Sequence, residues 1–324
     1  MLHGVVVQGF GLEGRRLRRE KSYYIASDAL LGALVIRRSM DGPGAIEFAH
    51  EVKELLAEKG FTSTDRFIIA RDGKPYVEHD GDTYTCTRYT SYLRQADFSA
   101  PQDILKAVDH VAVMHSLARG ISSPNNSKEP QPDISYELER DIRYISTIKK
   151  KIRHSGSLSD FDIMFLKNYD FYSEIMLEVQ KELSSTNIMQ YMATARANGH
   201  ILHNRLKEET ILLGEAPNSV YITNFTGASR GYAMFDLASM ASRYLAESNP
   251  EEQLPILAIL EQYSAKNTLN MEDIRILTAL LRYPHKFIRI CRSHYAKRRN
   301  WTPSSILGKM QEIIEGQAHY YAQI

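Results

Sequence analysis

The sequence contains few of the features that mark an extracellular, membrane or metal-binding protein. Its 324 residues include only two cysteines, Cys86 and Cys291, and neither lies in a Cys-x-x-Cys pair or a Cys/His cluster. This argues against a disulfide framework or a zinc site, and for a reducing cytosol. The longest apolar runs, such as Ala29 to Ile36, are far too short to span a bilayer. Met1 to Gly11 lacks a basic start and a small-residue cleavage site, so no secretory signal is expected.

The charge is nearly balanced. Lys and Arg number 40, Asp and Glu number 39, and the formal net charge is +1. Such a balance gives no general reason to expect nucleic acid or an anionic membrane as a partner. Hydrophobic residues make up 43% and charged residues 24% of the chain, which is the composition of an ordinary globular protein with a sizeable core.

The first 90 residues or so are predicted to be rich in strands. A helix is expected over Ile46 to Lys59, where Phe48, Val52 and Leu56 form an apolar stripe and Gly60 follows as a stop signal. Asp-Gly turns at 72–73 and 80–81 separate short runs typical of an antiparallel meander. The expected strands are Ser22–Ala26, Leu30–Arg37, Phe67–Ala70, Tyr76–Val77 and Tyr84–Tyr89, with a turn at Ala26-Ser27-Asp28 between the first two.

From Ala100 onward the apolar residues follow helical spacing. Helices are expected over about 103–119, 135–154, 160–184 and 186–197, and again over most of the last 90 residues, with a polar linker at Ile121–Pro132. The chain is therefore predicted to be α+β and two-lobed. Residues 1–90 would form a small antiparallel-sheet lobe with one helix, and residues 91–324 a large, mainly helical lobe. This is the outline of a protein-kinase-like fold, although many α+β chains share it.

The segment 203–225 has the frame of a phosphotransferase active site. It begins His203-Asn204-Arg205, has Thr210-Ile211-Leu212 five residues later, and ends with a hydrophobic strand and Asn224-Phe225. Small-molecule kinases of the aminoglycoside and choline type carry His-Gly-Asp, four residues, Asn-Ile-Leu, and a strand that ends in Asp-Phe. The frame is therefore present without its acidic residues.

Four further segments extend this resemblance over most of the chain. They are Asp72–Val77, Ala112–Gly120, Phe235–Ala238 and Leu280–Phe287, the last continuing through His294 to Trp301. Together they make the chain resemble the CotS-type family of bacterial spore coat proteins, which are relatives of aminoglycoside and choline kinases. The resemblance implies an aminoglycoside phosphotransferase-like fold, synthesis in the mother-cell cytoplasm and deposition in the spore coat. It also implies other coat proteins as partners and leaves a homo-oligomer open.

Three departures from the kinase pattern fall in one site. The base that accepts the substrate proton corresponds to Arg205, which cannot act as a base near neutral pH. The metal-binding Asn corresponds to Thr210, and the metal-binding Asp to Asn224, whereas Mg²⁺ prefers carboxylate and phosphate oxygens. A positioned base is typically worth ~10²–10⁴ in rate. The resemblance therefore implies a pseudokinase that needs no cofactor.

At other positions of the kinase pattern, the residue is either retained or replaced by one with the same charge and a different shape. Arg37 stands where the kinases have the Lys that holds the nucleotide phosphates, and Glu51 or Glu54 could pair with it as a remnant of that site. Arg keeps the positive charge, but its planar fork is bulkier than a Lys ammonium. His203 and Asp236 are expected to be structural, with Asp236 bracing the catalytic loop.

Two alternatives to a pseudokinase remain open. In one, the chain is an active phosphotransferase that uses ATP and Mg²⁺ on a hydroxyl or amine acceptor, with Glu208, Glu209 or Glu215 supplying relocated acidic groups. In the other, it is an α+β binding protein for an unknown ligand. A second register, with His200 at the conserved His, supplies no acid either.

Two local signals have simpler explanations. Gly9-Phe10-Gly11-Leu12-Glu13-Gly14 matches G-x-G-x-x-G, but a mostly charged stretch follows it in place of the apolar helix that a dinucleotide site needs. We interpret it as a chance match in a helix-to-strand connection. The basic run from Arg15 to Lys21 is interpreted as a strand edge protected by its charge.

Overall fold

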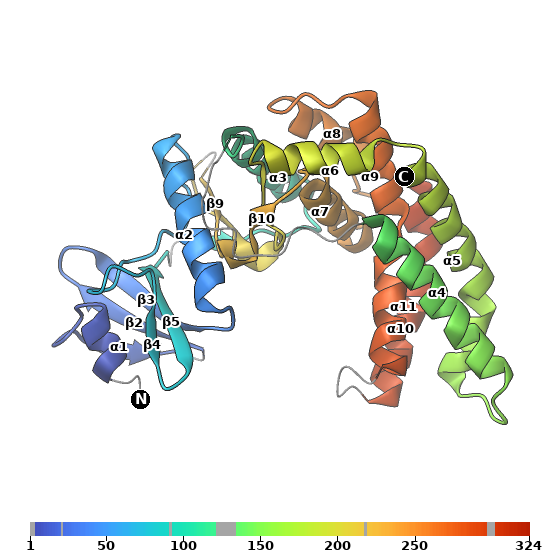
Figure 1. The fold of residues 1–324 in the computed structure, drawn as a ribbon, viewed down its shortest axis with the longest axis horizontal. Helices are drawn as coiled ribbons and strands as arrows, with labels where there is room; N and C mark the ends of the chain where they lie inside the picture. Colours follow the sequence, from blue (N-terminus) through green and yellow to red (C-terminus); the bar gives the residue numbers. More distant parts are fainter. Residues whose placement is uncertain (1–3, 21, 91–92, 121–133, 217–218, 297–301) are drawn as a thin grey trace.

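The structure, a computed structural model, describes residues 4–20, 22–90, 93–120, 134–216, 219–296 and 302–324. The chain forms a sheet-containing amino-terminal lobe and a helical carboxy-terminal part, drawn in blue and in green to red in Figure 1. This is the predicted α+β, two-lobed fold class. The expected linker at 121–132, and the boundary at residues 90 and 91, fall wholly or partly outside the described residues.

The amino-terminal lobe is built on a five-stranded sheet of order β1-β2-β3-β5-β4, in which every neighbouring pair is antiparallel. Because side chains alternate along a strand, Leu34 and Ile36 of β3 share a face that packs against Val6 of α1 and Phe10, which follows this helix. Arg37 therefore lies on the opposite face of the sheet. The elements are α1 (Gly4–Gly9), β1 (Leu17–Arg19), β2 (Tyr23–Asp28), β3 (Gly32–Ser39), α2 (Pro43–Glu58), β4 (Val77–His79) and β5 (Asp82–Arg88).

Helix α2 packs into the main hydrophobic core, which it shares with the carboxy-terminal helices. Pro43 is pre-set for the first helical turn, and Gly60, with φ of +88°, follows the helix end. Ala49, Val52 and Leu56 are fully buried at helical spacing. The predicted helix therefore forms, beginning three residues earlier than expected.

The carboxy-terminal part consists of long helices around short strands. Helices α4 and α5 run side by side at the right of Figure 1, and α5 starts with a capping box between Ser159 and Asp162. The elements are β6 (Arg94–Gln95), α3 (Pro101–Leu117), α4 (Ile134–Arg153), α5 (Asp160–Ser184), α6 (Ile188–Ala197), β7 (Ile201–Leu202), η1 (Glu208–Thr210), β8 (Ile211–Leu213), β9 (Val220–Ile222), η2 (Phe225–Gly227), β10 (Ser229–Arg230), α7 (Met234–Glu247), α8 (Ile256–Ser264), α9 (Met271–Arg282), α10 (His285–Tyr295) and α11 (Pro303–Ala322).

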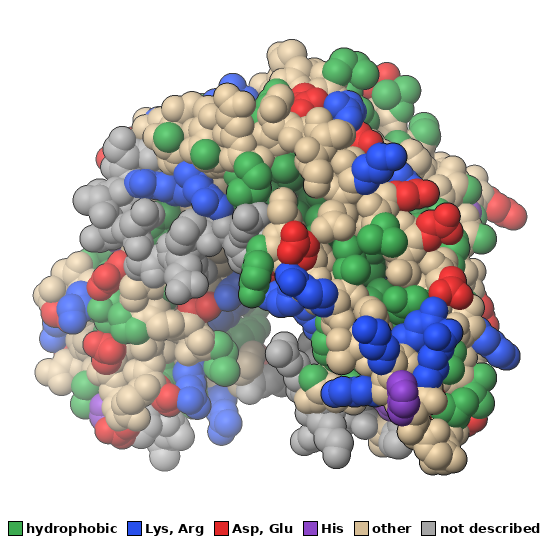
Figure 2. All heavy atoms as spheres, turned by 45° about the vertical axis from the view of Figure 1, so that its right-hand side comes forward, with side chains coloured by type: hydrophobic (Ala, Val, Ile, Leu, Met, Phe, Trp, Pro, Cys, Tyr) green, Lys and Arg blue, Asp and Glu red, His purple; other side chains and the backbone are tan. Residues whose placement is uncertain are grey.

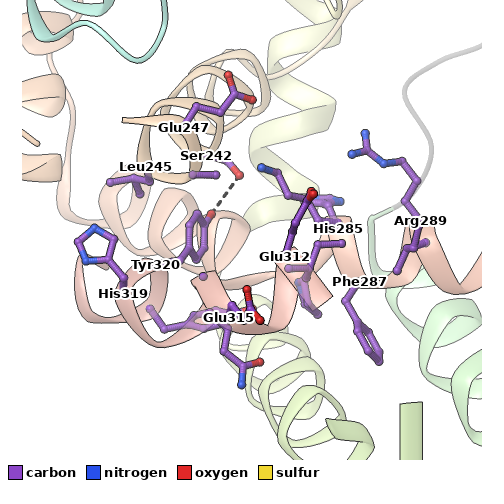
Figure 3. A pocket seen from close by; sticks show the side chains of 18 of the residues that line it. Ser242, Leu245, Glu247, His285, Phe287, Arg289, Glu312, Glu315, His319 and Tyr320 are labelled. Atoms are coloured by element: carbon purple, nitrogen blue, oxygen red, sulfur yellow. Dashed lines mark hydrogen bonds between the residues drawn. The ribbon is translucent and has the colours of Figure 1, made fainter. Parts of the chain in front are cut away.

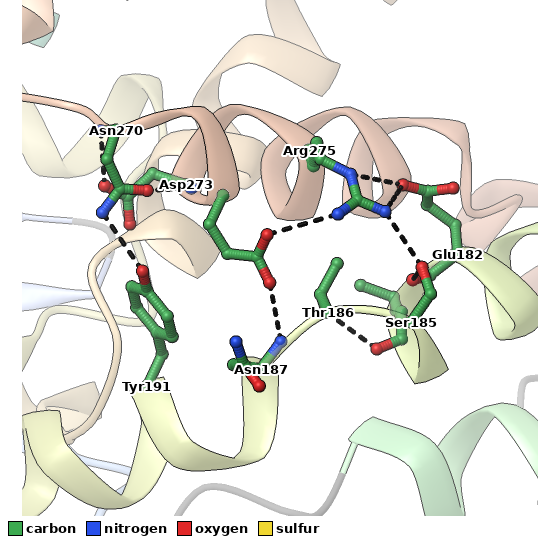
Figure 4. A network of polar contacts seen from close by, with 10 residues as sticks. Glu182, Ser185, Thr186, Asn187, Tyr191, Asn270, Asp273 and Arg275 are labelled. Carbon is green, nitrogen blue, oxygen red and sulfur yellow. Dashed lines mark hydrogen bonds and ion pairs between the residues drawn. The ribbon is translucent and has the colours of Figure 1, made fainter.

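The corner between α5 and α6 is fastened to α9 by polar contacts (Figure 4). Arg275 donates to Glu182 at 2.8 Å and to Ser185 at 2.9 Å, at the carboxyl end of α5. Glu272, one turn before Arg275, accepts from the backbone N–H of Asn187 at 2.7 Å. Elsewhere on α5, the ring of Tyr172 stacks on that of Phe287 of α10, with the ring centroids 3.8 Å apart. These contacts fix the helical framework around the predicted site.

Three predicted details of the amino-terminal lobe are wrong. The short helix α1 is present besides the one helix that was expected. The turn between β2 and β3 lies at residues 29–31, not 26–28, because the Asp28 carboxylate accepts from the N–H groups of Leu30 and Leu31, which follow it. Phe67–Ala70 forms a single bridge to Thr87 in place of a strand. Strand β4 pairs with the adjoining stretch of the same β5 edge, which leaves little room for a longer ladder.

The two simpler explanations agree with the structure. The G-x-G-x-x-G match lies where α1 ends and the chain connects to β1. Strand β1, which carries Arg18 and Arg19, is an edge strand of the sheet. Arg15 pairs with Asp28 and Arg18 with Glu20, both at 3.0 Å, while Lys21 lies outside the described residues.

Charges of both signs are interspersed over much of the face in Figure 2, with Lys and Arg gathered at its lower right. This fits the nearly neutral composition. Within the described residues, no helix combines the length and apolarity needed to cross a membrane.

Candidate functional site

The segment that follows β7 is held by one buried carboxylate. Asp236, in the first turn of α7, accepts the backbone N–H of His203 on Oδ2 at 2.7 Å and that of Asn204 on Oδ1 at 2.9 Å. His115 of α3 lies 3.1 Å from the same Oδ2. Two backbone donors and one ring therefore fix the start of the 203–225 segment against α3 and α7.

This cluster is fully enclosed, and its pKa values reflect that. Burial disfavours the charged form of Asp236, yet hydrogen bonds from His115 and from the His203 N–H hold the pKa of this carboxyl below its ordinary value. Burial lowers the pKa of His203 to about 4, against the opposing charge of Asp236. His203 is thus a neutral ring, and its Nε2 lies 2.9 Å from the Thr223 carbonyl oxygen.

The buried His203 predicts a loss of stability in acid. Its pKa rises on unfolding toward the ordinary value, so between about pH 6.5 and pH 4 the unfolded chain binds more protons than the folded one. The free energy of unfolding should therefore fall by about 3 kcal/mol through His203 as the pH drops across this window. Urea unfolding of wild type and His203→Gln at pH 7 and pH 4.5 measures it, with the exposed His154→Gln as control. If the difference in unfolding free energy between wild type and His203→Gln is the same at both pH values, the prediction is refuted.

Arg205, at the position of the catalytic base, forms an ion pair with the other lobe. Its two terminal nitrogens donate to the two carboxylate oxygens of Asp41, each at 2.7 Å. Asp41 lies between β3 and α2, in the amino-terminal lobe. The hydrogen bonds to Asp41 raise the pKa of Arg205 further above its ordinary range. The guanidinium therefore occupies the position where the kinase pattern has a proton acceptor.

Residues of η2 complete this contact. The Thr226 hydroxyl lies 2.6 Å from Asp41 Oδ2 and 2.8 Å from Asn224 Oδ1, and it accepts from Arg205 at 3.0 Å. Gly227 leaves space for the Arg205 stem, since a Cβ there would lie only 2.6 Å from Arg205 Cγ. Asn224 itself adopts a left-handed backbone with φ of 62°, which Asn tolerates better than most residues. Asn224, Thr226 and Arg205 are therefore joined in one network with Asp41.

Thr210, at the position of the metal-binding Asn, is turned into its own loop. Its hydroxyl donates to the Arg205 carbonyl at 2.7 Å and accepts from the Lys207 N–H at 3.0 Å. The residue is 2% exposed. The hydroxyl thus stabilises the loop, and its lone donor proton is already used.

A buried lysine lies beside Asn224. Lys53 of α2 is fully buried, and its ammonium contacts Asp65 Oδ1 and the Asp65 carbonyl oxygen, both at 2.7 Å. The same ammonium lies 3.9 Å from the ring centroid of Phe67. Burial lowers the pKa of Lys53, while Asp65 opposes this shift. Asp65 also accepts the backbone N–H of Asn224 at 3.2 Å, so this ion pair adjoins the metal position of the kinase pattern.

The residues expected to hold phosphate lie on strand β3 and on helix α2. Arg37 points from the sheet face opposite α1, and its guanidinium lies 5.2 Å from the ring centroid of Tyr23, its cross-strand neighbour. Glu54 is bound by Arg66 through its side-chain nitrogens. Glu51 lies on the same helix and has a contact of its own. The structure therefore directs Glu54 to Arg66.

Sequence reasoning missed the residues that neutralise the site. Lys53 could have been found, because it occupies a helical position between the buried Ala49, Val52 and Leu56. A cation at such a position requires a partner. No sequence pattern pointed to Asp41, because it lies in a short connection and its partner Arg205 is 164 residues away along the chain.

The donor groups do not fit a resident Mg²⁺. Asp41 and Asp65 approach Asn224, but each carboxylate is bound by its own cation, Arg205 and Lys53. In the part of the chain that the structure describes, no three His, Cys, Asp or Glu side chains gather in a metal-binding cluster. Of the relocated acids considered, Glu208 lies 3.8 Å from Arg243 of α7 and Glu209 3.3 Å from Lys207, while Glu215 is exposed.

A separate pocket of about 810 Å³ opens between α7, α10 and α11. Figure 3 shows Glu247, Arg289 and Glu312 around it, with Tyr320 held by a 3.0 Å hydrogen bond to Ser242. Acidic and basic side chains are mixed in its wall. No described residue of the 203–225 segment lines it.

The two lobes, together with the kinase-like spacing of the 203–225 segment, define a protein of the aminoglycoside phosphotransferase-like fold class. A family model described as "Spore coat putative kinase YutH" matches residues 5–324, and the chain belongs to this family. The predicted relationship to CotS-type spore coat proteins is thereby confirmed. Family membership supports a location in the spore coat.

Solved structures agree on the fold. An aminoglycoside phosphotransferase from Alicyclobacillus acidocaldarius aligns with a TM-score of 0.86 at 20% identity, covering 99% of this chain and 94% of that one. Spectinomycin phosphotransferase APH(9)-Ia, solved with ADP and spectinomycin, aligns with a TM-score of 0.64 at 12% identity, covering 95% and 92%. A microcompartment-associated aminopropanol kinase gives 0.60 at 13%, covering 95% and 92%. A search of curated proteins found no match.

Proposed function

We propose that the chain is a catalytically impaired, kinase-like structural component of the spore coat that requires no cofactor. It would be synthesised in the mother-cell cytoplasm and assembled by contacts with other coat proteins. Family membership supports the coat assignment. The arrangement of the 203–225 segment supports the loss of catalysis.

The observation that carries the proposal is the ion pair between Arg205 and Asp41. In a phosphotransferase, the residue at this position accepts a proton from the attacking group. A guanidinium with both ends bound to a carboxylate has no lone pair for that proton. The Thr210 hydroxyl is hydrogen-bonded within its own loop, and Asn224 contributes a neutral amide. Three positions of one site therefore lack the groups that would accept the proton and bind the metal.

The alternative is an active ATP-dependent phosphotransferase with relocated acids. The observation in its favour is that two carboxylates absent from the kinase pattern, Asp41 and Asp65, come close to Asn224. For either to bind Mg²⁺ or accept a proton, its cation would have to leave. This alternative therefore requires that at least one of the two ion pairs opens on nucleotide binding.

Titration calorimetry with ATP distinguishes the two. We expect no Mg²⁺-dependent binding heat and no ADP formation on prolonged incubation, because the groups that bind metal and accept the proton are missing or neutralised. The titration without Mg²⁺ serves as the matched control. Tight Mg²⁺-dependent binding together with phosphoryl transfer to an acceptor would refute the proposed function and favour the enzyme.

A further inference from the structure

The contact between Asp41, Arg205 and Thr226 is here called the interlobe contact. It joins the connection between β3 and α2, in one lobe, to the segment 205–226 in the other. Both carboxylate oxygens and both terminal guanidinium nitrogens take part, which is the strongest geometry for an Arg–carboxylate pair. The Asp41 side chain is 19% exposed and that of Arg205 38%, so water still reaches the pair.

The lobes are also joined at the other end of α2, by contacts that depend little on charge pairing. Lys59 donates to the carbonyl oxygens of Leu117 and Arg119, at 3.0 and 2.7 Å, at the end of α3. The N–H of Ile222 donates to the Ser63 carbonyl at 3.0 Å. The carboxyl end of α2 is therefore anchored through backbone groups. At the amino end, next to Asp41, the interlobe contact adds charge pairing to the apolar packing of Ile46 and Ala49 in the core that also contains Phe225 of η2.

The path of Arg205 toward Asp41 depends on a missing side chain. A Cβ at position 227 would lie 2.6, 2.8 and 2.9 Å from Cγ, Cδ and Nε of Arg205. The guanidinium thus passes over a glycine to reach a carboxylate that comes from a distant part of the chain. Asp41 takes the position that an external anion would need in order to pair with this cation.

We propose that Asp41 is an internal anion that occupies Arg205, holding the two lobes together at the amino end of α2 and preventing an external anion from binding there. The contact is autoinhibitory with respect to anion binding. It operates whether or not the protein transfers phosphate, because it concerns only the pairing of Arg205. The matching ligand class is an inorganic polyphosphate, which would pair with a freed guanidinium through charge-assisted hydrogen bonds.

The test uses the full chain and the variant Asp41→Ala, with two readouts taken without Mg²⁺. Hydrogen–deuterium exchange of peptides covering 36–45 and 222–229 is expected to become at least tenfold faster, because the amino end of α2 separates from η2. Titration with inorganic tripolyphosphate is expected to give a Kd at least tenfold lower than for wild type. The double variant Asp41→Ala/Arg205→Ala should keep the fast exchange and lose the gain in binding.

The matched control is Glu174→Ala, which makes the same change in net charge at an exposed position of α5, outside both exchange peptides. It should leave both readouts at wild-type values. If Asp41→Ala does not fold, the charge exchange Asp41→Arg/Arg205→Asp replaces it, and slow exchange with no tripolyphosphate binding would support the proposal. The proposal would be overturned if hydrogen exchange and tripolyphosphate binding in Asp41→Ala both stayed at wild-type values. It would also be overturned if Asp41→Arg/Arg205→Asp showed fast hydrogen exchange and no tripolyphosphate binding. Phosphoryl transfer by the wild type would overturn the proposed function alone.

Discussion

Replacing Asp236 by alanine is expected to lower the free energy of unfolding by about 3–5 kcal/mol, the usual cost of removing one partner from a buried charged network. Three donors lose their acceptor at once: the N–H groups of His203 and Asn204, and Nε2 of His115. All three donors contact the side chain of Asp236, a residue that is only 2% exposed. Water cannot replace the lost hydrogen bonds without opening the core.

Urea unfolding followed by circular dichroism measures this change. The matched control is Glu139→Ala, which removes a carboxylate from the exposed ion pair with Arg143 on α4 and should cost below about 0.5 kcal/mol. Exchange of a peptide covering 199–210 should also accelerate in Asp236→Ala, because the amides of His203 and Asn204 lose their acceptor. A loss of less than about 1 kcal/mol would contradict the bracing role of Asp236.

Replacing Lys53 by alanine is expected to cost about 3 kcal/mol. In the wild type, the Lys53 ammonium lies 2.7 Å from both the Asp65 carboxylate and the Asp65 carbonyl oxygen, and the substitution leaves both oxygens without this donor. It removes the cation from the face of the Phe67 ring as well. It also removes the packed stem of a fully buried side chain. Thermal and urea unfolding of wild type and variant give the value.

A second variant separates charge pairing from packing. Lys53→Met/Asp65→Asn removes both charges and keeps the stem, so it should recover most of the stability lost in Lys53→Ala, as buried ion pairs often do when both partners are neutralised. The exposed pair Arg71–Glu13 provides a control, with Arg71→Ala within about 0.5 kcal/mol of wild type. If Lys53→Ala is as stable as wild type, the buried pair contributes nothing to the fold.

Much of the fold could be predicted from local pattern. Helix α5 begins and ends at the predicted residues, because a capping signal precedes it and the apolar spacing is continuous to its end. Helix α2 was predicted from its stripe and its glycine stop. The turn before β3 was placed three residues early, since the sequence shows an Asp but does not show that its side chain caps the residues after it.

The candidate site was predictable in position but not in its contacts. The spacing of His203, Arg205, Thr210 and Asn224 identified the segment and the loss of its acidic groups. The partners Asp41 and Asp65 lie more than 150 residues away in sequence from Arg205 and Asn224, the residues they bind. Pairings at such separation depend on how the lobes pack, which local spacing does not encode.

Local sequence was enough to infer the two-lobed α+β plan, the family resemblance and the absence of a base at position 205. These follow from periodicity and from the chemistry of single side chains. Three pairings depend on how the distant parts of the chain pack: Arg205 is bound by Asp41 across the lobes, Lys53 is buried against Asp65, and Glu54 pairs with Arg66. The reason is that the state of a charged group depends on burial and on the nearest opposite charge, and both are set by residues distant in the chain.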